Sequence, residues 1–354
     1  MKAQWRTFLE NAGAEFRDGE VASYGNPEQE LSIALTGNVF ADLSHLGLIA
    51  VHGADAQEFL QGQLANDVGR VDEAHSQINA YCSPKGRMLA TFRLFRHGDA
   101  FYLRLPAALV EPVLKRLRMF VLRSQVTLED ASGAYVALGA SGPTVDQELA
   151  ESFGEVPQAT DAVRTASGCT MLRLPGVHPR FEIYGPLDTM TKLWESLNVR
   201  AAPVGATSWA LLDVMAGIPT VYPETSDAFV PQMANLQLVG GVSFAKGCYP
   251  GQEVVARMEY LGKLKRRMYL ALVRSETAPR PGDELFAPDS PGQSVGRVVD
   301  AQPHPDGAYA TLGVIQIANA EGGEVRYGAA DGPPLDFRPL PYTLESVGAG
   351  GAQS

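Results

Sequence analysis

The feature that most constrains this chain is an ordered alternation of strand and helix patterns over residues 47–130. A short apolar run at 48–51 precedes a short helix, and strand-like runs at 88–95 and 101–105 flank a hairpin turn of Arg, His, Gly and Asp. Apolar residues near helical spacing then predict a longer helix over 106–121. This order of elements indicates a mixed unit in which helices pack on a sheet.

A weaker copy of the same order occupies residues 134–200. An apolar run at 135–138 leads through a Gly- and Pro-containing turn into a helix. The runs 171–174 and 181–184 are expected to pair as strands, and 187–197 carries a further helical face. Two similar units predict an internal duplication.

The two ends of the chain differ from this pattern. Residues 4–12 predict a short amphipathic helix, and the polar, Gly-, Asn- and Pro-rich residues 17–30 predict a loop, with globular patterning from Leu31. Beyond Lys265, short strands between turn residues predict a small antiparallel barrel. These strand candidates are 268–273, 294–299, 308–317 and 324–327.

Together the patterns predict an α+β fold with two related α/β units and a C-terminal antiparallel β-barrel. A chain of 354 residues is long enough for two or three domains. The predicted parts are an N-terminal helix and loop (1–30), a first α/β unit (31–130), a second α/β unit (131–262), a barrel (263–345) and a disordered tail (346–354).

Charge and hydropathy exclude several classes of protein. The formal net charge is −11, which argues against a protein that coats nucleic acid through a basic face. The N-terminus has no unbroken apolar region of a signal peptide, and no run of about 18 apolar residues predicts a membrane span. We therefore expect a cytoplasmic protein without membrane contact.

One basic cluster stands out against this acidic background. It consists of Lys263, Lys265, Arg266 and Arg267 at the expected start of the barrel. A solvated edge strand is the favoured interpretation. Contact with a polyglutamate tail or with RNA is the alternative.

The three cysteines do not form a metal or disulfide pattern. Cys82, Cys169 and Cys248 contain no C-x-x-C pair, and the histidines lack ligand spacing, so no metal site is predicted. An odd number of cysteines in a long chain is typical of a reducing compartment.

The stretch 243–257, SFAKGCYPGQEVVAR, is the most unusual in the chain. Gly247 and Gly251 flank a tight turn, and Pro250 is expected to begin a helix whose buried face holds Val254, Val255 and Met258. Cys248 would then lie just before a helix N-terminus.

That position and the nearby Lys246 both favour a thiolate at Cys248, although Glu253 would oppose it if it faces the sulfur. The alternative is that Cys248 is a small buried residue in a Gly-rich loop, as most lone cysteines are. Local chemistry alone leaves both interpretations open.

The run Lys246-Gly247-Cys248-Tyr249-Pro250-Gly251-Gln252-Glu253, followed by Arg257, resembles the K-G-C-[FY]-x-G-Q-E signature of the YgfZ family. Four further stretches resemble that family over roughly residues 42–345. They are the first helix (Gly53-Ala54-Asp55 and Phe59 to Gln63), a K-G-[KR] hairpin (Lys85-Gly86-Arg87), the approach to the signature (Phe229 to Gln232 and Asn235 to Gln237) and a last strand (Pro339 to Tyr342).

The resemblance implies folate-binding proteins that are related to the glycine-cleavage T-protein and act in iron–sulfur enzyme maturation and tRNA modification. It implies three domains in a ring around a central channel, tetrahydrofolate or a derivative as cofactor, and iron–sulfur assembly factors and client enzymes as partners. Cys248 would be the functional thiol. The implied cofactor-binding residues are Lys246, Tyr249, Gln252, Glu253, Arg257, Gln232, Asn235 and Asp213.

Two departures bear on the chemistry. Where the T-protein has an acidic pair in a G-G-x-x-D-D type strand, this chain has Ala90 and Thr91, which argues against aminomethyl transfer. Where the family has a glutamate before Ala-Gly, this chain has Met215, which weakens the expectation of folate binding. If that segment is a strand, Asp213 points to the same side and compensates; otherwise it is a solvated surface acid.

Several other residues keep two interpretations. Gln232 and Asn235 either line the channel or cap loops, and Arg257 either binds an anion or pairs with a surface acid. Cys82 and Cys169 are expected to be structural, although Cys82 lies close enough to Lys85 to face the channel.

The first functional hypothesis is a folate-binding accessory protein for assembly or repair of iron–sulfur clusters, with Cys248 as its thiol. The alternative is a folate-dependent one-carbon transferase or demethylase. Direct tRNA binding is a third hypothesis, which the net charge of −11 makes the weakest.

Overall fold

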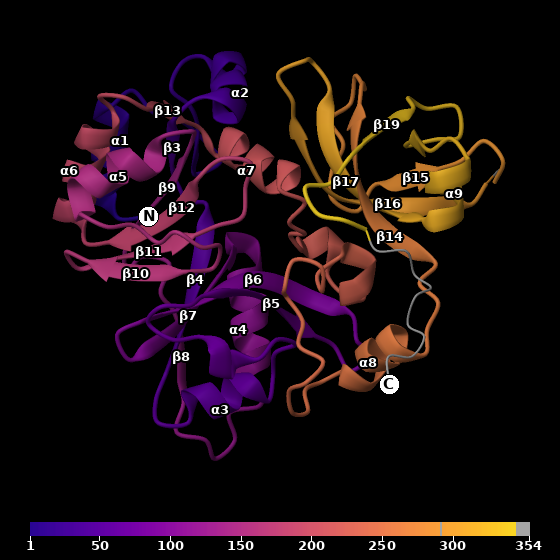
Figure 1. The fold of residues 1–354 in the computed structure, drawn as a ribbon, viewed down its shortest axis with the longest axis horizontal. Coiled ribbons are helices and arrows are strands. Elements are labelled where there is room, and N and C mark those ends of the chain that lie inside the picture. The colour runs from indigo at the N-terminus through magenta and orange to yellow at the C-terminus, as the bar shows by residue number, and fades with distance from the viewer. Residues whose placement is uncertain (291, 345–354) are drawn as a thin grey trace.

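The computed structural model describes residues 1–290 and 292–344. The predicted disordered tail, 346–354, lies outside these residues. Three large sheets organise the described part of the chain, and Figure 1 shows them as three separate parts of the molecule. The mixed fold predicted from the patterns is therefore confirmed at the level of its sheets.

The first sheet has five strands in the order β5-β6-β7-β4-β8. Helices α3 and α4 and the 3₁₀ turns η1 and η2 connect them. The bounds are β4 Leu46–His52, α3 Ala56–Gln61, η1 Val68–Arg70, β5 Gln77–Cys82, β6 Met88–His97, β7 Ala100–Pro106, η2 Ala107–Leu109, α4 Val110–Arg118 and β8 Thr127–Asp130.

The predicted hairpin between the second and third strands of this unit is confirmed. Strands β6 and β7 pair antiparallel, and Gly98 has a φ of 58° in the turn. The predicted helix after Pro106 ends earlier than expected, at Arg118. Phe120, which the pattern places on the apolar face, is 40% exposed because it lies beyond the last helical turn.

The second sheet has six strands in the order β10-β11-β12-β9-β3-β13. Its order β10-β11-β12-β9 matches β5-β6-β7-β4 of the first sheet, as a duplicated unit would give. The predicted pairing of 171–174 with 181–184 is confirmed by β11 and β12. The bounds are β3 Val39–Asp42, β9 Val136–Ser141, α5 Val145–Phe153, β10 Val163–Ala166, β11 Cys169–Arg173, β12 Arg180–Gly185, α6 Leu187–Leu197 and β13 Ala202–Val204.

Strand β3 belongs to this second sheet although it precedes the whole first sheet in the chain. It pairs antiparallel with β9 and parallel with β13. The sheets are therefore not contiguous in sequence, and the boundaries given above remain predictions.

The prediction of a loop over 17–30 is wrong. The N-terminal elements are α1 Ala3–Asn11, β1 Glu15–Arg17, β2 Glu20–Ser23 and α2 Pro27–Thr36. Asp18 and Gly19 form the tight turn of the β1–β2 hairpin at positive φ, and the Asn26 side chain accepts from Gln29 N–H to cap α2, with Pro27 at its first position. The pattern predicts a loop because turn and cap residues make up much of these very short elements.

The third sheet is antiparallel and curled, with the order β18-β15-β16-β17-β14-β19. Its edges approach each other through a bridge between Arg326 and Pro334, so the sheet forms a half-barrel rather than a fully laddered barrel. The bounds are β14 Arg266–Val273, β15 Glu284–Phe286, β16 Ser294–Pro303, β17 Tyr309–Gln316, α9 Ile317–Gly322, β18 Arg326–Tyr327 and β19 Leu335–Arg338.

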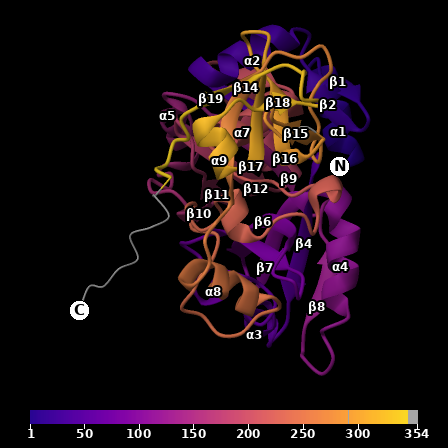
Figure 2. The same cartoon turned by 90° about the vertical axis from the view of Figure 1, so that its right-hand side faces the viewer.

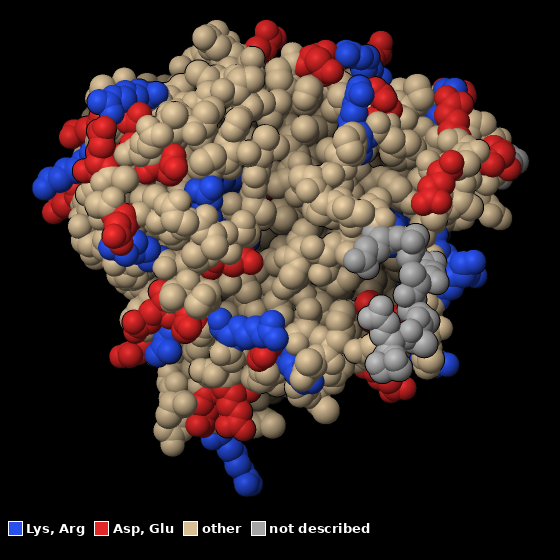
Figure 3. Space-filling model, viewed as in Figure 1, with Lys and Arg blue, Asp and Glu red and all other residues tan. Residues whose placement is uncertain are grey.

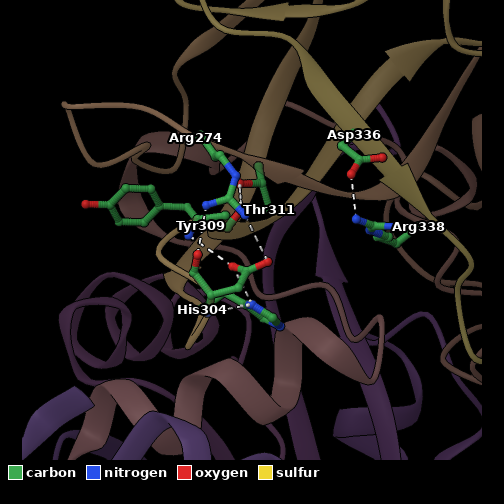
Figure 4. Close-up of polar contacts among 8 residues, drawn as sticks. Arg274, His304, Tyr309, Thr311, Asp336 and Arg338 are labelled. Carbon is green, nitrogen blue, oxygen red and sulfur yellow. Dashed lines mark hydrogen bonds and ion pairs between the residues drawn. The ribbon is translucent and has the colours of Figure 1, made fainter. Parts of the chain in front are cut away.

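The last strand is therefore Leu335–Arg338, not the segment 339–342 that resembles the family's last strand. That segment instead returns to the middle of the molecule, where Tyr342 Oη donates to Gly217 O at 2.8 Å. At the outer rim of the sheet, His304 and Arg274 both contact Asp306, and Asp336 pairs with Arg338 (Figure 4). Exposed pairs of this kind contribute little stability.

Helix α7 (Ala206–Met215) connects the parts of the molecule. It packs against α2 and β2 on one side and against β16 and β17 of the curled sheet on the other. Asp213 therefore lies on a helix, so the same-side placement expected for a strand does not apply. The run Trp-Ala-Leu-Leu is compatible with a helix, and Gly217 at a φ of 66° followed by Pro219 ends it.

The remaining elements follow α7, and the signature lies between the last two of them and at the start of the last one. They are η3 Pro223–Thr225, η4 Pro231–Ala234 and α8 Gln252–Tyr260. The apolar cluster of the first sheet continues through this segment into the curled sheet, where it includes Leu270, Leu312 and Val314. One core thus joins the first and third sheets.

The N-terminal segment is fastened to the start of α7 by a buried carboxylate. Glu30 accepts from Tyr24 N–H at 2.6 Å and from Gly205 N–H at 2.9 Å. A Cβ at Gly205 would lie 2.1 Å from Ala22 O of β2, so the two backbones touch.

We expect Gly205→Ala to lower the free energy of unfolding by about 2–3 kcal/mol, because the new methyl group forces two backbone segments apart. Gly133→Ala is the control, since its Cβ meets nothing within 4 Å. Urea unfolding of both variants measures the difference. Equal stabilities would contradict the close approach of β2 and α7.

Candidate functional site

A cavity of about 310 Å³ lies beside α7, between the first sheet and the curled sheet. Its walls come from β4 and β7 of the first sheet, from α7, from the segment 220–222 and from β16 of the curled sheet. A smaller hollow shares Arg104, Pro106, Asp213 and Thr220 with it and extends toward Thr91. A volume of this size is within the range of small-molecule sites.

A buried ion pair holds Asp213, one of the lining residues, although its partner Arg180 is not itself part of the lining. Arg180 on β12 is 1% exposed and contacts Asp213 on α7 at 2.5 Å. Burial would raise the pKa of Asp213, but the charges of Arg180 and Arg104 outweigh it and hold the pKa below its usual range. Asp213 is thus an ionised residue of the cavity wall and not a solvated surface acid.

Trp209 completes this side of the cavity. The Arg180 guanidinium lies over its ring at 4.6 Å, which fixes both groups. The space for the ring comes from Gly139 on β9, where a Cβ would lie 2.6 Å from the indole. Trp209 Nε1 and Arg180 Nε are buried without a hydrogen-bond partner in the described chain.

A second buried pair joins the first and second sheets. Arg104 on β7 binds both carboxylate oxygens of Glu182 on β12, with Nη2 to Oε1 at 2.7 Å and Nε to Oε2 at 3.2 Å. Tyr184 donates to the same carboxylate at 2.8 Å. The hydrogen bond and the ion-pair contact together hold β7 and β12 against each other.

The curled sheet contributes an acid to the same cavity. Asp300 on β16 is 2% exposed and accepts from Tyr222 Oη and from Gln302 Nε2, each at 3.0 Å. Burial is the main cause that raises the pKa of Asp300 to about 6, and the charge of Asp213 adds to it. His45 has the opposite shift: burial, followed by the charge of Arg104, lowers its pKa to about 4, so the ring is neutral at pH 7.

The positions that match the T-protein acidic pair hold no charge here. Ala90 is fully buried, and Thr91 is 4% exposed. Thr91 Oγ1 donates to Pro219 O at 3.0 Å and accepts from Val221 N–H at 2.9 Å. Thr91 therefore joins β6 to the segment after α7, and Met215 packs against the apolar core.

The signature loop lies apart from this cavity, since none of its residues is among the cavity's lining residues. Lys246 Nζ donates to the carbonyl oxygens of Gln61, Leu64 and Asn66 at 2.6, 2.6 and 3.2 Å. These bonds use all three donors of the ammonium, so Lys246 anchors the loop to the end of α3. Burial lowers the pKa of Lys246 to about 8, while the Asp67 carboxylate opposes this shift.

A pair of glycines anchors the other side of the loop. Gly251 and Gly86 have φ values of 83° and 69°, and a Cβ on Gly251 would lie 2.6 Å from Gly86 Cα. The signature therefore rests directly on the β5–β6 turn that contains Lys85-Gly86-Arg87. The resemblance of both stretches to one family thus corresponds to one physical contact.

Between these anchors the side chain of Cys248 is exposed, so the interpretation of a buried structural cysteine is wrong. Gln252 Nε2 donates to the carbonyls of Lys246 and Gly247 at 3.3 Å each and holds the turn. Tyr249 is buried, with the Lys246 ammonium 5.2 Å from its ring centroid. The helix begins at Gln252, after Gly251 rather than at Pro250.

The buried face expected for this helix is only partly present. Val255 is fully buried, but Val254 is 38% exposed. Glu253 and Arg257 are exposed. Neither of these two charges lines the cavity.

The two amides near the signature serve as internal fasteners. Gln232 Nε2 donates to Val255 O at 2.7 Å, and Asn235 Nδ2 donates to Met268 O at 2.8 Å. Asn235 adopts a left-handed backbone at a φ of 57°, which asparagine tolerates. They tie α8 and β14 to η4, which agrees with the loop-capping interpretation.

The structure thus divides the predicted site residues into three places. Lys246, Cys248, Tyr249 and Gln252 form the anchored loop, Gln232 and Asn235 lie in the core beneath it, and Asp213 lines the cavity. Sequence reasoning missed several polar residues in or beside the cavity. They are Arg104, Arg180, Glu182, Trp209, Tyr222 and Asp300. For Glu182 the sequence does contain a signal, because a single charge stands inside the otherwise apolar strand Phe-Glu-Ile-Tyr.

The other predictions can be placed as well. Cys82 and Cys169 are buried, and burial raises the pKa of their thiols to about 12 and about 11. Cys82 is not among the residues that line the cavity. Within residues 1–290 and 292–344, no group of three or more His, Cys, Asp or Glu side chains has the arrangement of a metal site. No helix in the same ranges is long and apolar enough to cross a membrane.

The basic cluster lies at the start of β14, where Arg266 and Arg267 pair with β17 on one side and β19 does not reach them on the other. Strand β14 pairs with β17 along its length and with β19 over Leu270–Val273. Lys263, Lys265 and Arg266 are exposed, whereas Arg267 is buried. On the face in Figure 3, acidic and basic side chains are interspersed, without a continuous basic surface.

Comparisons with known proteins show the family and the fold of this chain. A family model described as the GCVT N-terminal domain matches residues 23–243. The tRNA-modifying protein YgfZ of Colwellia psychrerythraea is 33% identical over 311 residues, which cover 86% of this chain and 93% of that protein. The protein of the same name from Escherichia coli is 31% identical over 320 residues, covering 90% and 98%.

Among solved structures, the glycine cleavage system aminomethyltransferase T from Bartonella henselae superposes with a TM-score of 0.76. The match covers 95% of this chain and 96% of that chain, at 20% sequence identity. This similarity shows a shared fold.

The buried carboxyl of Asp300 predicts a pH-dependent stability. An unfolded aspartate ionises near pH 4, whereas the folded one ionises near pH 6, so the folded state loses relative stability as pH rises between these values. We expect Asp300→Asn to match the wild type near pH 4 and to exceed its free energy of unfolding by up to ~3 kcal/mol at pH 7.5. Urea unfolding across this range measures the difference. Asp306→Asn, at an exposed carboxylate, should give no such gain, and a pH-independent effect at Asp300 would sink the assignment.

Proposed function

We propose, from the premise that this chain belongs to the YgfZ family within the glycine-cleavage T-protein fold, that it acts in tRNA modification as an accessory protein. In this proposal it assists the assembly or repair of iron–sulfur clusters in the modifying enzymes and in other clients. It does so through the Cys248 thiol and a folate bound in the cavity around α7. Its partners are then iron–sulfur assembly factors and client enzymes.

The observation that carries the proposal is the mounting of Cys248. Its thiol is exposed on a loop that Lys246 fastens to the end of α3 and Gly251 fastens to the β5–β6 turn. A mobile surface cysteine would need neither anchor. A thiol that is both accessible and fixed in position can reach a partner's iron or persulfide in one orientation.

The cavity around α7 fits a folate in size and in polar groups. Asp213 offers a carboxylate acceptor for the N–H groups of a pterin, and Trp209 offers an aromatic wall. Trp209 Nε1 and Arg180 Nε are buried hydrogen-bond donors for which the described chain provides no acceptor. Asp213 thereby takes the role expected of the family's glutamate, which Met215 cannot take.

When bound, tetrahydrofolate would supply a reduced pterin that can carry a one-carbon unit. The chain's own residues bind and orient it: Arg180 holds the Asp213 carboxylate in place, and Arg104 with Glu182 closes the wall between the first two sheets. Burial keeps His45 neutral at pH 7, whereas Asp300, with a pKa of about 6, is mostly ionised there and adds a second carboxylate to the cavity wall.

A one-carbon transferase or demethylase is the alternative function. Ala90 and Thr91 provide no carboxylate at the position that matches the T-protein acidic pair, and Thr91 is fully engaged by Pro219 and Val221. The accessory role is therefore favoured. Direct tRNA binding is not favoured, because the formal net charge is −11.

The test of the thiol is complementation of a strain that lacks its own family member. We expect wild type to restore tRNA modification and iron–sulfur enzyme activity, and Cys248→Ser to restore neither. The double variant Cys248→Ser/Thr277→Cys is the control, because it moves an exposed thiol to another surface position. Modified nucleosides are measured by mass spectrometry. Equal rescue by Cys248→Ser would end the thiol proposal.

The test of the folate site uses tryptophan fluorescence. Of the three tryptophans, Trp209 lines the cavity, whereas Trp5 and Trp194 pack together in another core cluster. We expect tetrahydrofolate to quench fluorescence saturably in wild type and not in Trp209→Phe. Asp213→Asn should weaken binding about tenfold through loss of a charge-assisted bond.

The two tests fail independently. Absence of saturable quenching at millimolar tetrahydrofolate would remove the folate part and leave the role of Cys248 standing. Tetrahydrofolate-dependent release or transfer of a one-carbon unit would favour the transferase alternative.

A further inference from the structure

We propose that a second pocket, beside α4, binds an organic anion with an apolar body, and that Arg116 anchors the anion. The pocket has a volume of about 360 Å³ and shares no residue with the cavity around α7. Helix α4 runs along an outer side of the molecule in Figure 2. The lining residues Lys115 and Met119 are exposed, so a ligand can reach this pocket from solvent.

The lining of this pocket is mostly apolar. One wall is the ring of Tyr81 on β5, and aliphatic side chains of β6, η2 and α4 supply most of the rest. The complete lining is Tyr81, Leu89, Leu109, Pro112, Val113, Lys115, Arg116, Met119 and Ser226. An apolar hollow of this size on a surface is typical of a binding site, because its walls gain stability when a ligand covers them.

Two cations of α4 line the same hollow. Arg116 lies with its guanidinium carbon 5.9 Å from the Tyr81 ring centroid, and its Nε is buried without a hydrogen-bond partner in the described chain. Lys115 is exposed next to it. Among the residues that the structure describes, no carboxylate lies within 4.0 Å of either cation.

This combination defines the chemistry of the ligand. Arg116 is half-buried and its guanidinium also interacts with Tyr81, but its buried Nε has no acceptor in the described chain, and a carboxylate or sulfonate oxygen at that position would satisfy this donor. The apolar walls select a body that is aromatic or aliphatic. Met119, 60% exposed at the rim, can adjust its thioether to ligands of different shape.

The shape of the site favours a small molecule over a membrane surface. The apolar face of α4, with Val110, Leu114 and Leu117, is buried against the first sheet and is not free to enter lipid. A concave hollow takes up a ligand of limited size. Two classes of small molecule have this chemistry: an acyl-chain acid and an aromatic acid.

The probe is 1-anilinonaphthalene-8-sulfonate, which joins an aromatic body to one sulfonate and fluoresces in apolar sites. We expect one binding site on the native full-length chain. Arg116→Gln and Met119→Glu should each weaken binding at least about tenfold. Leu122→Glu is the matched control: it adds the same charge three residues from Met119, at a side chain that is 89% exposed and does not line the pocket, and should leave binding unchanged.

Competition identifies the ligand source. Displacement by dodecanoate supports an acyl-chain acid, displacement by indole-3-acetate supports an aromatic acid, and dodecanol should compete at least about tenfold more weakly than dodecanoate. Far-UV circular dichroism and the thermal midpoint show whether each variant is folded. Binding that survives both Arg116→Gln and Met119→Glu, that neither acid displaces, or that tetrahydrofolate displaces would overturn the proposal.

Discussion

The arrangement of this molecule depends on charges buried where its sheets meet. Arg104 and Glu182 hold the first sheet to the second, and Arg180 and Asp213 hold the second to α7. Buried ion pairs gain little net stability, because removing both charges from water costs about as much as their attraction returns. Their value is geometric, since a carboxylate separated from its arginine would be left uncompensated. The pairs therefore select one relative placement of the sheets, and the cavity exists only in that placement.

Glycines fix the position of the signature loop, as the buried ion pairs fix the position of the sheets. At Gly251 and Gly86 the backbones approach so closely that a methyl group on either would collide, and at Gly139 the missing side chain is replaced by the Trp209 ring. A glycine in a family signature is thus explained here by contact rather than by flexibility. Lys246 also has a structural role, because its ammonium donates to three carbonyl oxygens and not to the neighbouring thiol.

The sequence was informative where one pattern repeats over many residues, and uninformative where a role depends on distant partners. The β6–β7 hairpin and the β11–β12 pairing follow from alternation and turn residues. The sequence pattern predicts a loop at the Asp18-Gly19 hairpin and the Asn26 cap, because the elements there are only three to ten residues long. Asp213 is a candidate site residue in the sequence, but the sequence does not reveal its helix or its partner, because Arg180 lies 33 positions earlier. Arg104, Glu182 and Asp300 were missed because an isolated charge in a strand becomes meaningful only when another sheet faces it.

The loop and the cavity are separate in space, but both rest on strand β6. Its leading turn supports Gly251, its first residue exchanges backbone bonds with Asp227 and Phe229, and Thr91 holds the segment 219–221 at the cavity wall. A rigid strand that carries both regions keeps the distance from thiol to cavity constant. In the accessory role this constancy matters more than proximity, because the thiol must meet a partner outside the protein while the cofactor stays inside. In the proposed function, a T-protein fold with Ala90 and Thr91 in place of the acidic pair holds a folate in its cavity and presents the Cys248 thiol at the surface.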